Sequence, residues 1–179
     1  YASLIRDTLI DIRDDGSFRL NLDYFGFRES PVMTNECFDR LFGGPARKPA
    51  ARITRREMDL AASIQKVVEE ALVKLAAHAT RITGCRNLAM AGGVALNCVA
   101  NGHILRQIDL DGFFAQPAAG DAGGALGAAL LATHREFGVP RRTVAGGDSL
   151  KGSLLGPAFS ADEIAAFVER TDATGHRID

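Results

Sequence analysis

Residues 87–121 constrain the fold of this chain most strongly, because one local pattern occurs there twice. Residues 87–91 form a short apolar run that is typical of a buried strand, and this run leads directly into Gly92-Gly93-Val94-Ala95-Leu96-Asn97. Residues 98–107 then have the composition of a helix. The sequence therefore predicts a strand that enters a glycine-rich turn and continues as a helix.

The second copy of the pattern starts with the apolar residues 112–117 and continues into the turn Gly120-Asp121-Ala122-Gly123-Gly124. Residues 121–137 are rich in alanine, leucine and glycine, which predicts a helix that packs closely against a neighbour. Alternating strands and helices favour an α/β layer with right-handed crossovers. We therefore predict a mixed or parallel sheet that contains both apolar runs and is covered by helices at residues 57–83 and 121–137.

Paired glycines after a strand suit the approach of a ligand, because a backbone without Cβ atoms leaves its amides bare. The helix that follows such a turn adds unpaired N–H groups and a positive dipole end, which together favour a phosphate. The spacing here fits neither the dinucleotide-binding fingerprint nor the phosphate-loop pattern. Gly92 and Gly93 would equally serve to let a helix pack tightly on the sheet.

Together the two segments resemble one family. Ala91-Gly-Gly-Val-Ala-Leu-Asn97, followed by Pro117-Ala-Ala-Gly-Asp-Ala-Gly-Gly-Ala-Leu-Gly-Ala-Ala129, is similar to the ATP-dependent O-carbamoyltransferases related to nodulation protein U and to antibiotic-tailoring carbamoyltransferases. The chain resembles the tRNA threonylcarbamoyladenosine enzymes more distantly. This resemblance implies an actin-like ATPase (ribonuclease H-like) fold with a mixed sheet flanked by helices, as in sugar kinases and heat-shock chaperone ATPases.

The resemblance also implies roles for individual residues. Asp121 would be a ligand of a divalent metal, iron or magnesium, although the histidine pair that shares this metal in the family has no counterpart among the four histidines here. Asn97 and Asp121 would equally serve as helix caps. No catalytic side chain is assigned. The residues expected to bind ATP are Gly92, Gly93, Val94, Asn97, Gly120 and Gly123.

The implied reaction has two steps. ATP and carbamoyl phosphate give a carbamoyl-adenylate, and the carbamoyl group then passes to a hydroxyl of a small-molecule acceptor. We expect this chain to supply part of the nucleotide site and to be inactive alone. Two alternatives stay open, namely a sugar or acetate kinase-like member of the same superfamily, and a non-catalytic module for nucleotide binding or dimerisation.

Composition places further bounds on the protein. With 179 residues, 46% of them hydrophobic, and a formal charge of −1, the chain can bury one core and gives no reason to expect nucleic acid or membrane as a partner. Three cysteines without a C-x-x-C pair suggest reduced thiols and a cytoplasmic protein. The chain starts without methionine and both ends lie in patterned segments, so we expect a piece of a longer protein whose remaining parts are its partners; a homodimer is a further option.

We divide the chain into three parts. Residues 1–56 read as a hairpin within residues 1–24, turning at Asp14-Asp15-Gly16, and a connecting loop with a short helix at residues 35–42. Residues 57–139 are the expected nucleotide-site core, and residues 140–179 a link and a C-terminal helix. A basic cluster in the loop is interpreted as a solvated face, or else as a surface that binds a phosphate-bearing substrate or a neighbouring domain. It consists of Arg47, Lys48, Arg52, Arg55 and Arg56.

The strongest helical signal covers residues 57–83 and ends before Gly84. His78 on this helix is interpreted as an ordinary histidine and Cys98 as a buried thiol, since neither has a matched partner nearby. Ser160-Ala-Asp-Glu163 predicts a capping box that opens a helix over residues 162–170. The solvent face of the 57–83 helix is predicted to carry Glu57, Lys66, Glu69, Glu70 and Lys74.

Overall fold

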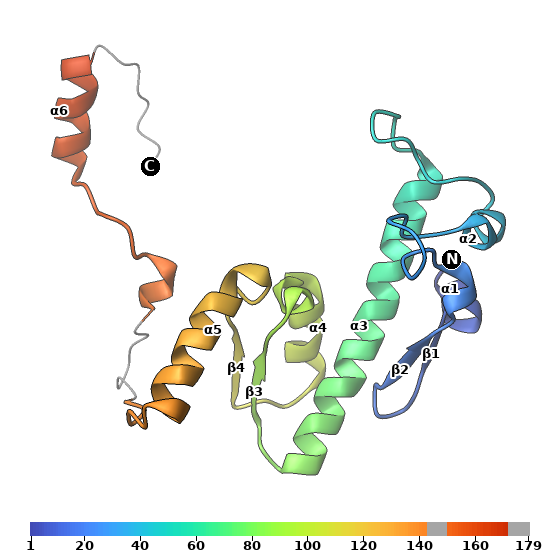
Figure 1. The fold of residues 1–179 in the computed structure, drawn as a ribbon, viewed down its shortest axis with the longest axis horizontal. Coiled ribbons are helices and arrows are strands. Elements are labelled where there is room, and N and C mark those ends of the chain that lie inside the picture. Colours follow the sequence, from blue (N-terminus) through green and yellow to red (C-terminus); the bar gives the residue numbers. More distant parts are fainter. Residues whose placement is uncertain (143–149, 172–179) are drawn as a thin grey trace. The chain divides into compact units, whose positions relative to one another are not determined.

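The structure, a computed structural model, describes residues 1–142 and 150–171. The chain forms two compact units, Tyr1–Ala129 and a second that begins at Leu130. The first unit contains helices and two short sheets, so the predicted α/β class is confirmed (Figure 1). Its elements are α1 (Ala2–Thr8), β1 (Ile10–Ile12), β2 (Phe18–Leu20), α2 (Glu36–Leu41), α3 (Arg55–Thr83), β3 (Asn87–Met90), α4 (Cys98–Gln107), β4 (Gly112–Ala115) and the start of α5 (Gly124–Leu131), with short 3-10 turns at Leu22–Tyr24, Gly93–Leu96 and Asp121–Gly123.

The N-terminal hairpin is confirmed, but a helix precedes it. Strands β1 and β2 pair antiparallel, with Ile10 opposite Leu20. Gly16 turns the chain with a φ of +80°, and a Cβ at this position would collide with the backbone of Leu75 on α3. Asp15 accepts hydrogen bonds from the hydroxyl and amide of Ser17, which lower the pKa of its carboxyl. The acidic turn residue is therefore used by the turn itself.

Residues 2–8, which the sequence pattern included in the hairpin region, form α1 instead. The reason is the four-residue spacing of Ile5 and Leu9, which places both side chains on one face against α3. Val67 of α3 and Phe42 after α2 complete this buried cluster, and the rings of Phe38 and Phe42 lie 4.5 Å apart between centroids. The predicted short helix at residues 35–42 is confirmed as α2, capped by Asn35.

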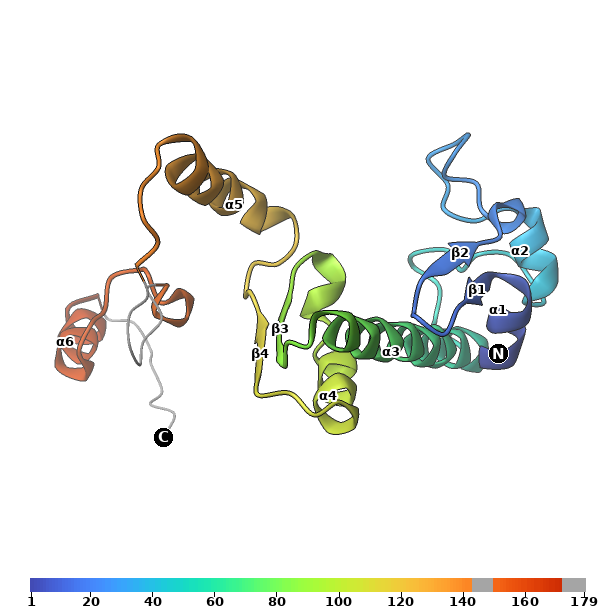
Figure 2. The ribbon, with the colours of Figure 1, turned by 90° about the horizontal axis from the view of Figure 1, so that it is seen from below.

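Helix α3 is confirmed and runs for 29 residues. It starts with a capping box between Thr54 and Glu57 and ends at Gly84, which has a left-handed φ of 64°. The predicted solvent face is partly wrong, because the Glu69 side chain is only 16% exposed and lies toward α4. A single solvent face does not exist because α3 packs against α1 on one side and α4 on another (Figure 2).

The predicted sheet is confirmed in its pairing. Strands β3 and β4 are parallel, with Asn87 opposite Gly112 and Met90 opposite Ala115, and α4 connects them. Where the strands begin, Arg86 bridges Asp109 and Asp111 with N–O distances of 2.6 and 3.1 Å. These two carboxylates, above all Asp109, raise the pKa of the Arg86 guanidinium.

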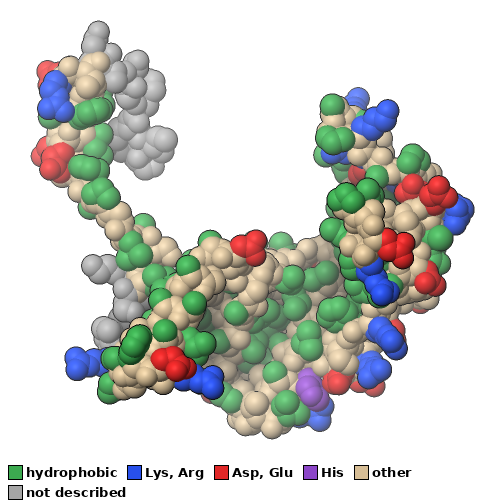
Figure 3. Space-filling model, in the orientation of Figure 1, with side chains coloured by type: hydrophobic (Ala, Val, Ile, Leu, Met, Phe, Trp, Pro, Cys, Tyr) green, Lys and Arg blue, Asp and Glu red, His purple; other side chains and the backbone are tan. Residues whose placement is uncertain are grey.

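The expected cover of this sheet by helix 121–137 is not seen within the first unit, where residues 124–129 of α5 are all exposed. Phe114 of β4 is 54% exposed, so part of the sheet face is open. Parallel sheets are ordinarily covered on both faces. The space-filling view shows many further apolar side chains at the surface of the first unit (Figure 3).

The second unit contains the end of α5, a π-helical turn (Ala132–Glu136), a 3-10 turn (Lys151–Ser153) and α6 (Ala161–Thr171). The predicted capping box is confirmed, since the Ser160 amide donates to Glu163 Oε2 at 2.7 Å and the Glu163 amide donates to Ser160 Oγ at 3.2 Å. The Ser160 amide and hydroxyl, which both donate to the Glu163 carboxylate, lower the pKa of Glu163. Of the predicted link, residues 143–149 lie outside the described residues. Within the described parts of the chain, every helix is too short or too polar to cross a membrane.

The capping box of α3 predicts a pH-dependent stability. The Thr54 hydroxyl and amide bond the Glu57 carboxylate and lower its pKa from 4.5 to about 2. A depressed folded-state pKa contributes stability that is complete above the unfolded value and lost as the pH falls through the folded value. We therefore expect Glu57→Gln to lower the free energy of unfolding above pH 4.5, and the difference from wild type to shrink toward pH 2.

Urea unfolding at a series of pH values measures this difference. Glu36→Gln is the matched control, because Glu36 is 91% exposed and its ion pair with Arg40, at 3.6 Å, should contribute little. A Glu57→Gln difference that stays constant between pH 7 and pH 2 would contradict the assigned role of the carboxylate.

Candidate functional site

The two glycine turns meet beyond the carboxyl ends of β3 and β4. The Gly92 amide donates to the Ala119 carbonyl oxygen at 2.9 Å. A Cβ on Gly120 would lie 3.6 Å from the Gly93 Cα, so the two turns are in van der Waals contact. Ligands of open α/β sheets bind outside the carboxyl ends of the strands. The structure thus brings the sequence-predicted turns together at the edge where a ligand is expected.

The first turn combines a glycine of positive φ with unpaired backbone amides. Gly92 has φ 94° and ψ 161°, a conformation that only glycine adopts readily. Cβ atoms on Gly92 and Gly93 would meet nothing within 4 Å, so the space beside both residues is open. The Gly93 and Val94 amides have no acceptor among the described residues. Such adjacent N–H groups are suited to an anion.

In the second turn, close packing explains why residue 123 is a glycine. A Cβ on Gly123 would collide with the Ala118 carbonyl oxygen, and the Gly123 amide donates to the Gly120 carbonyl at 3.1 Å. Gln116 Oε1 accepts a hydrogen bond from the Ala118 amide. Gly123 is therefore needed to close the turn, and its expected contact with ATP stays a prediction.

Asp121 begins the 3-10 turn after Gly120 and is exposed. The N-cap position of this turn is Gly120, and Asp121 is the acidic residue of the first turn, so its role as a helix cap stays a prediction. Across residues 1–142 and 150–171, no three His, Cys, Asp or Glu side chains are grouped closely enough to hold a metal ion. The described residues alone therefore do not fit a metal centre, and Asp121 as a ligand stays a prediction.

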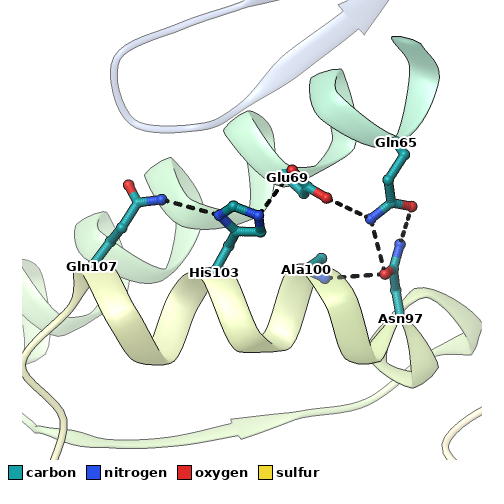
Figure 4. A network of polar contacts seen from close by, with 6 residues as sticks. All are labelled: Gln65, Glu69, Asn97, Ala100, His103 and Gln107. Atoms are coloured by element: carbon teal, nitrogen blue, oxygen red, sulfur yellow. Dashed lines mark hydrogen bonds and ion pairs between the residues drawn. The ribbon is translucent and has the colours of Figure 1, made fainter. Parts of the chain in front are cut away.

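Asn97 does cap a helix. Its Oδ1 accepts from the Ala100 amide at 3.1 Å, which satisfies one of the open N–H groups of α4. The side-chain carboxamide of Asn97 also pairs with that of Gln65 on α3. Asn97 Nδ2 donates to Gln65 Oε1 at 2.9 Å, and Gln65 Nε2 donates to Asn97 Oδ1 at 3.1 Å (Figure 4). The cap interpretation is confirmed, and the contact of Asn97 with nucleotide remains a prediction.

The polar contacts continue along both helices. Gln65 Nε2 donates to Glu69 Oε1 at 2.8 Å, and Glu69 Oε2 lies 3.3 Å from His103 Nε2 (Figure 4). Gln107 Nε2 is 3.5 Å from His103 Nδ1. We name Gln65, Glu69 and Asn97, with His103, the α3–α4 network. Sequence reasoning missed it, and the one available signal was the four-residue spacing of Gln65 and Glu69 on the amphipathic helix α3.

Asn101 was also missed. Its Nδ2 donates to the Ala95 carbonyl at 2.8 Å, which fixes the 3-10 turn that follows Gly93. Its Oδ1 is buried and accepts no hydrogen bond from the described residues. Cys98, predicted to be a buried thiol, is exposed because the buried face of α4 consists of Ala100 and Ile104.

Three arginines of the basic cluster in the connecting loop form ion pairs or hydrogen bonds with nearby groups of this chain. Arg55 pairs with Asp59 at 3.0 Å, and Arg56 pairs with Glu57 at 2.9 Å. Arg47 donates to three carbonyl oxygens of its own loop. The partners of these three arginines therefore belong to the loop and to the start of α3, and not to the glycine turns.

The structure defines an α/β chain with two apposed glycine turns, and comparison with known proteins identifies its family. The chain belongs to the carbamoyltransferase N-terminus family, whose profile matches residues 1–130. It is 47% identical to an uncharacterized protein of Synechocystis sp., sll1178, over 94% of this chain and 27% of that protein.

Two nodulation proteins are also similar. NolNO of Sinorhizobium fredii is 38% identical over 69% of this chain and 17% of its own length. NolO of Bradyrhizobium diazoefficiens is 37% identical over 73% of this chain and 22% of its own length. The chain thus spans about a quarter or less of the curated relatives it matches.

The backbone of the first turn predicts a difference between neighbouring glycines. Gly92→Ala forces an L-residue to the positive φ of Gly92 and should cost about 1–3 kcal/mol of unfolding free energy. Gly93→Ala places its Cβ in open space and should change stability by less than about 0.5 kcal/mol. Thermal and urea unfolding of both variants measure the difference. Equal losses would show that this description of the turn is wrong.

Proposed function

We propose that this chain supplies the nucleotide-facing part of a carbamoyltransferase that uses ATP and carbamoyl phosphate to carbamoylate a hydroxyl group of a small molecule. The observation that carries the proposal is the bond from the Gly92 amide to the Ala119 carbonyl, which unites two glycine turns beyond parallel strand ends. Membership in the carbamoyltransferase family supports the reaction class. An actin-like ATPase fold of the whole protein is part of the proposal.

The turns suit phosphate because they offer donors without bulk. The Gly93 and Val94 amides would bind phosphoryl oxygens, and the open space at both glycines would admit the nucleotide. Between residues 87 and 124 the only basic side chains are His103 and Arg106, so neutral N–H groups would carry most of this chain's share of charge stabilisation.

The proposed chemistry passes through an adenylate. Water first cleaves carbamoyl phosphate to carbamate and inorganic phosphate. A carbamate oxygen then attacks the α-phosphorus of ATP, and pyrophosphate leaves. The acceptor hydroxyl oxygen then attacks the carbamoyl carbon, AMP leaves, and the hydroxyl gives up its proton. The role of this chain is to hold the phosphates through its backbone, so no nucleophilic side chain is required from it.

Gly93→Val tests the nucleotide site. The valine side chain enters the open space beside the turn, so the protein should fold while losing most of its ATP affinity. Gly127→Val is the matched control, because Gly127 of α5 also faces open space but lies outside both turns. Isothermal titration with ATP and circular dichroism on the full-length protein decide the matter. A folded Gly93→Val variant with wild-type affinity would remove the site from these glycines.

An assay of ATP consumption by the full-length protein separates the alternatives. ATP consumption that depends on carbamoyl phosphate supports the carbamoyltransferase, whereas consumption that depends on a sugar or acetate supports a kinase. A full-length protein that binds no ATP would instead be a non-catalytic module.

Asp121→Asn tests the proposed metal ligand. Because the described residues supply Asp121 without partner ligands, this chain alone should bind divalent iron or magnesium weakly. In the full-length protein the variant should keep its fold, since Asp121 is exposed and asparagine keeps its size and its ability to cap a helix, but lose bound metal and carbamoyl-dependent turnover. Elemental analysis and turnover assays measure both. Wild-type metal content in the variant would exclude Asp121 as a ligand.

A further inference from the structure

We propose that Gln65 and Glu69 of α3 are positioning residues for the first glycine turn: Glu69 orients Gln65, and Gln65 holds Asn97 so that its amide offers a ligand only an N–H donor. The inference rests on the proposed nucleotide site. It adds two residues that lie about thirty positions earlier in the chain, on a helix that the turn does not belong to.

The orientation of the amides follows from both ends of the network. An ionised carboxylate only accepts hydrogen bonds, so Glu69 requires Gln65 to turn its Nε2 toward it, at 2.8 Å. At the other end the Ala100 amide is a donor and requires the Oδ1 of Asn97, at 3.1 Å. These two independent requirements give the same arrangement of the Gln65–Asn97 amide pair, in which each nitrogen faces the other side chain's oxygen.

Counting hydrogen bonds shows what remains for a ligand. Gln65 uses both N–H groups, toward Glu69 and Asn97, and its oxygen accepts from Asn97. Asn97 Oδ1 already accepts twice, and its Nδ2 donates once, to Gln65. One N–H of Asn97 is left without a partner among the described residues. A group bound there must therefore be an acceptor, such as a phosphoryl or ribose oxygen.

The network also fixes the turn in space. Asn97 ends the 3-10 turn Gly93–Leu96 and begins α4, so holding its side chain holds both segments. Gln65 is well supported, because Val67 two residues later is 1% exposed in the N-terminal core. His103 of α4 adds a second attachment to Glu69, at 3.3 Å. The first glycine turn is thus anchored to the buried part of α3.

Gln65→Leu tests the inference in the full-length protein. Leucine keeps a similar volume but removes both bonds to Asn97, so the dissociation constant for ATP should rise about 10-fold. Lys66→Leu is the matched control, because Lys66 is the exposed neighbour of Gln65 on α3 and should leave ATP affinity unchanged. Isothermal titration gives the affinities, and thermal unfolding reports stability separately.

A double-mutant cycle separates positioning from mere helix packing. If Gln65 acts through Asn97, adding Gln65→Leu to Asn97→Ala should change ATP affinity by less than about twofold. If Gln65 only joins α3 to α4, its variant lowers the unfolding temperature but leaves the ATP affinity of the folded protein at the wild-type value. Should Gln65→Leu not fold, Glu69→Leu removes the contacts of Glu69 with Gln65 and His103 and should weaken ATP binding about fivefold.

The outcomes are distinct. A wild-type protein that binds no ATP overturns the proposed function and this inference together. A wild-type protein that binds ATP, with a folded Gln65→Leu or Glu69→Leu variant of equal affinity, overturns the inference alone. Losses for Gln65→Leu and Asn97→Ala that multiply in the double variant also overturn it, because they show that the two residues act independently.

Discussion

The packing of α3 against α4 is the contact on which the candidate site depends. A sheet of two short strands is not stable in water by itself, so β3 and β4 need a surface to lie on. Helix α3 contacts β3 and also packs against α4, whose Ala100 and Ile104 are fully buried. Since α3 is fixed at its other side by Ile5 and Val67, the glycine turns inherit their position from the N-terminal core.

Sequence reasoning recovered the parts of the fold that local patterns encode. The α3 helix followed from apolar spacing and Gly84, the parallel strands from two apolar runs before glycine turns, and the capping box of α6 from Ser160 and Glu163. The failures concern which neighbour an element faces. Glu69 reads as a solvent residue because a helix pattern cannot show that a second helix, containing His103, lies beside its charged stripe.

The same limit applies to the candidate site. The glycines of both turns could be identified from the sequence, because glycine clusters after apolar runs indicate turns. The hydrogen bond from Gly92 to Ala119 could not, because it depends on how the strands pair. The partner of Asn97 was not foreseeable, since Gln65 is an ordinary polar residue far away in the chain. We expected α5 to cover the β3–β4 sheet, and its residues in the first unit are exposed instead. The alanines and glycines of α5 allow close packing but do not specify which neighbour the helix packs on.

The parallel pair β3–β4 has a consequence for handling the protein. Within residues 1–142 and 150–171 each of the two strands has one unpaired edge, and Phe114 stands on an open face. Unpaired strand edges are templates for the addition of another strand, and charged residues are the usual protection against it. Here Arg86, Asp109 and Asp111 are used in bridging each other at one end of the strands. At high protein concentration these strand edges are therefore the sites at which we expect aggregation to begin.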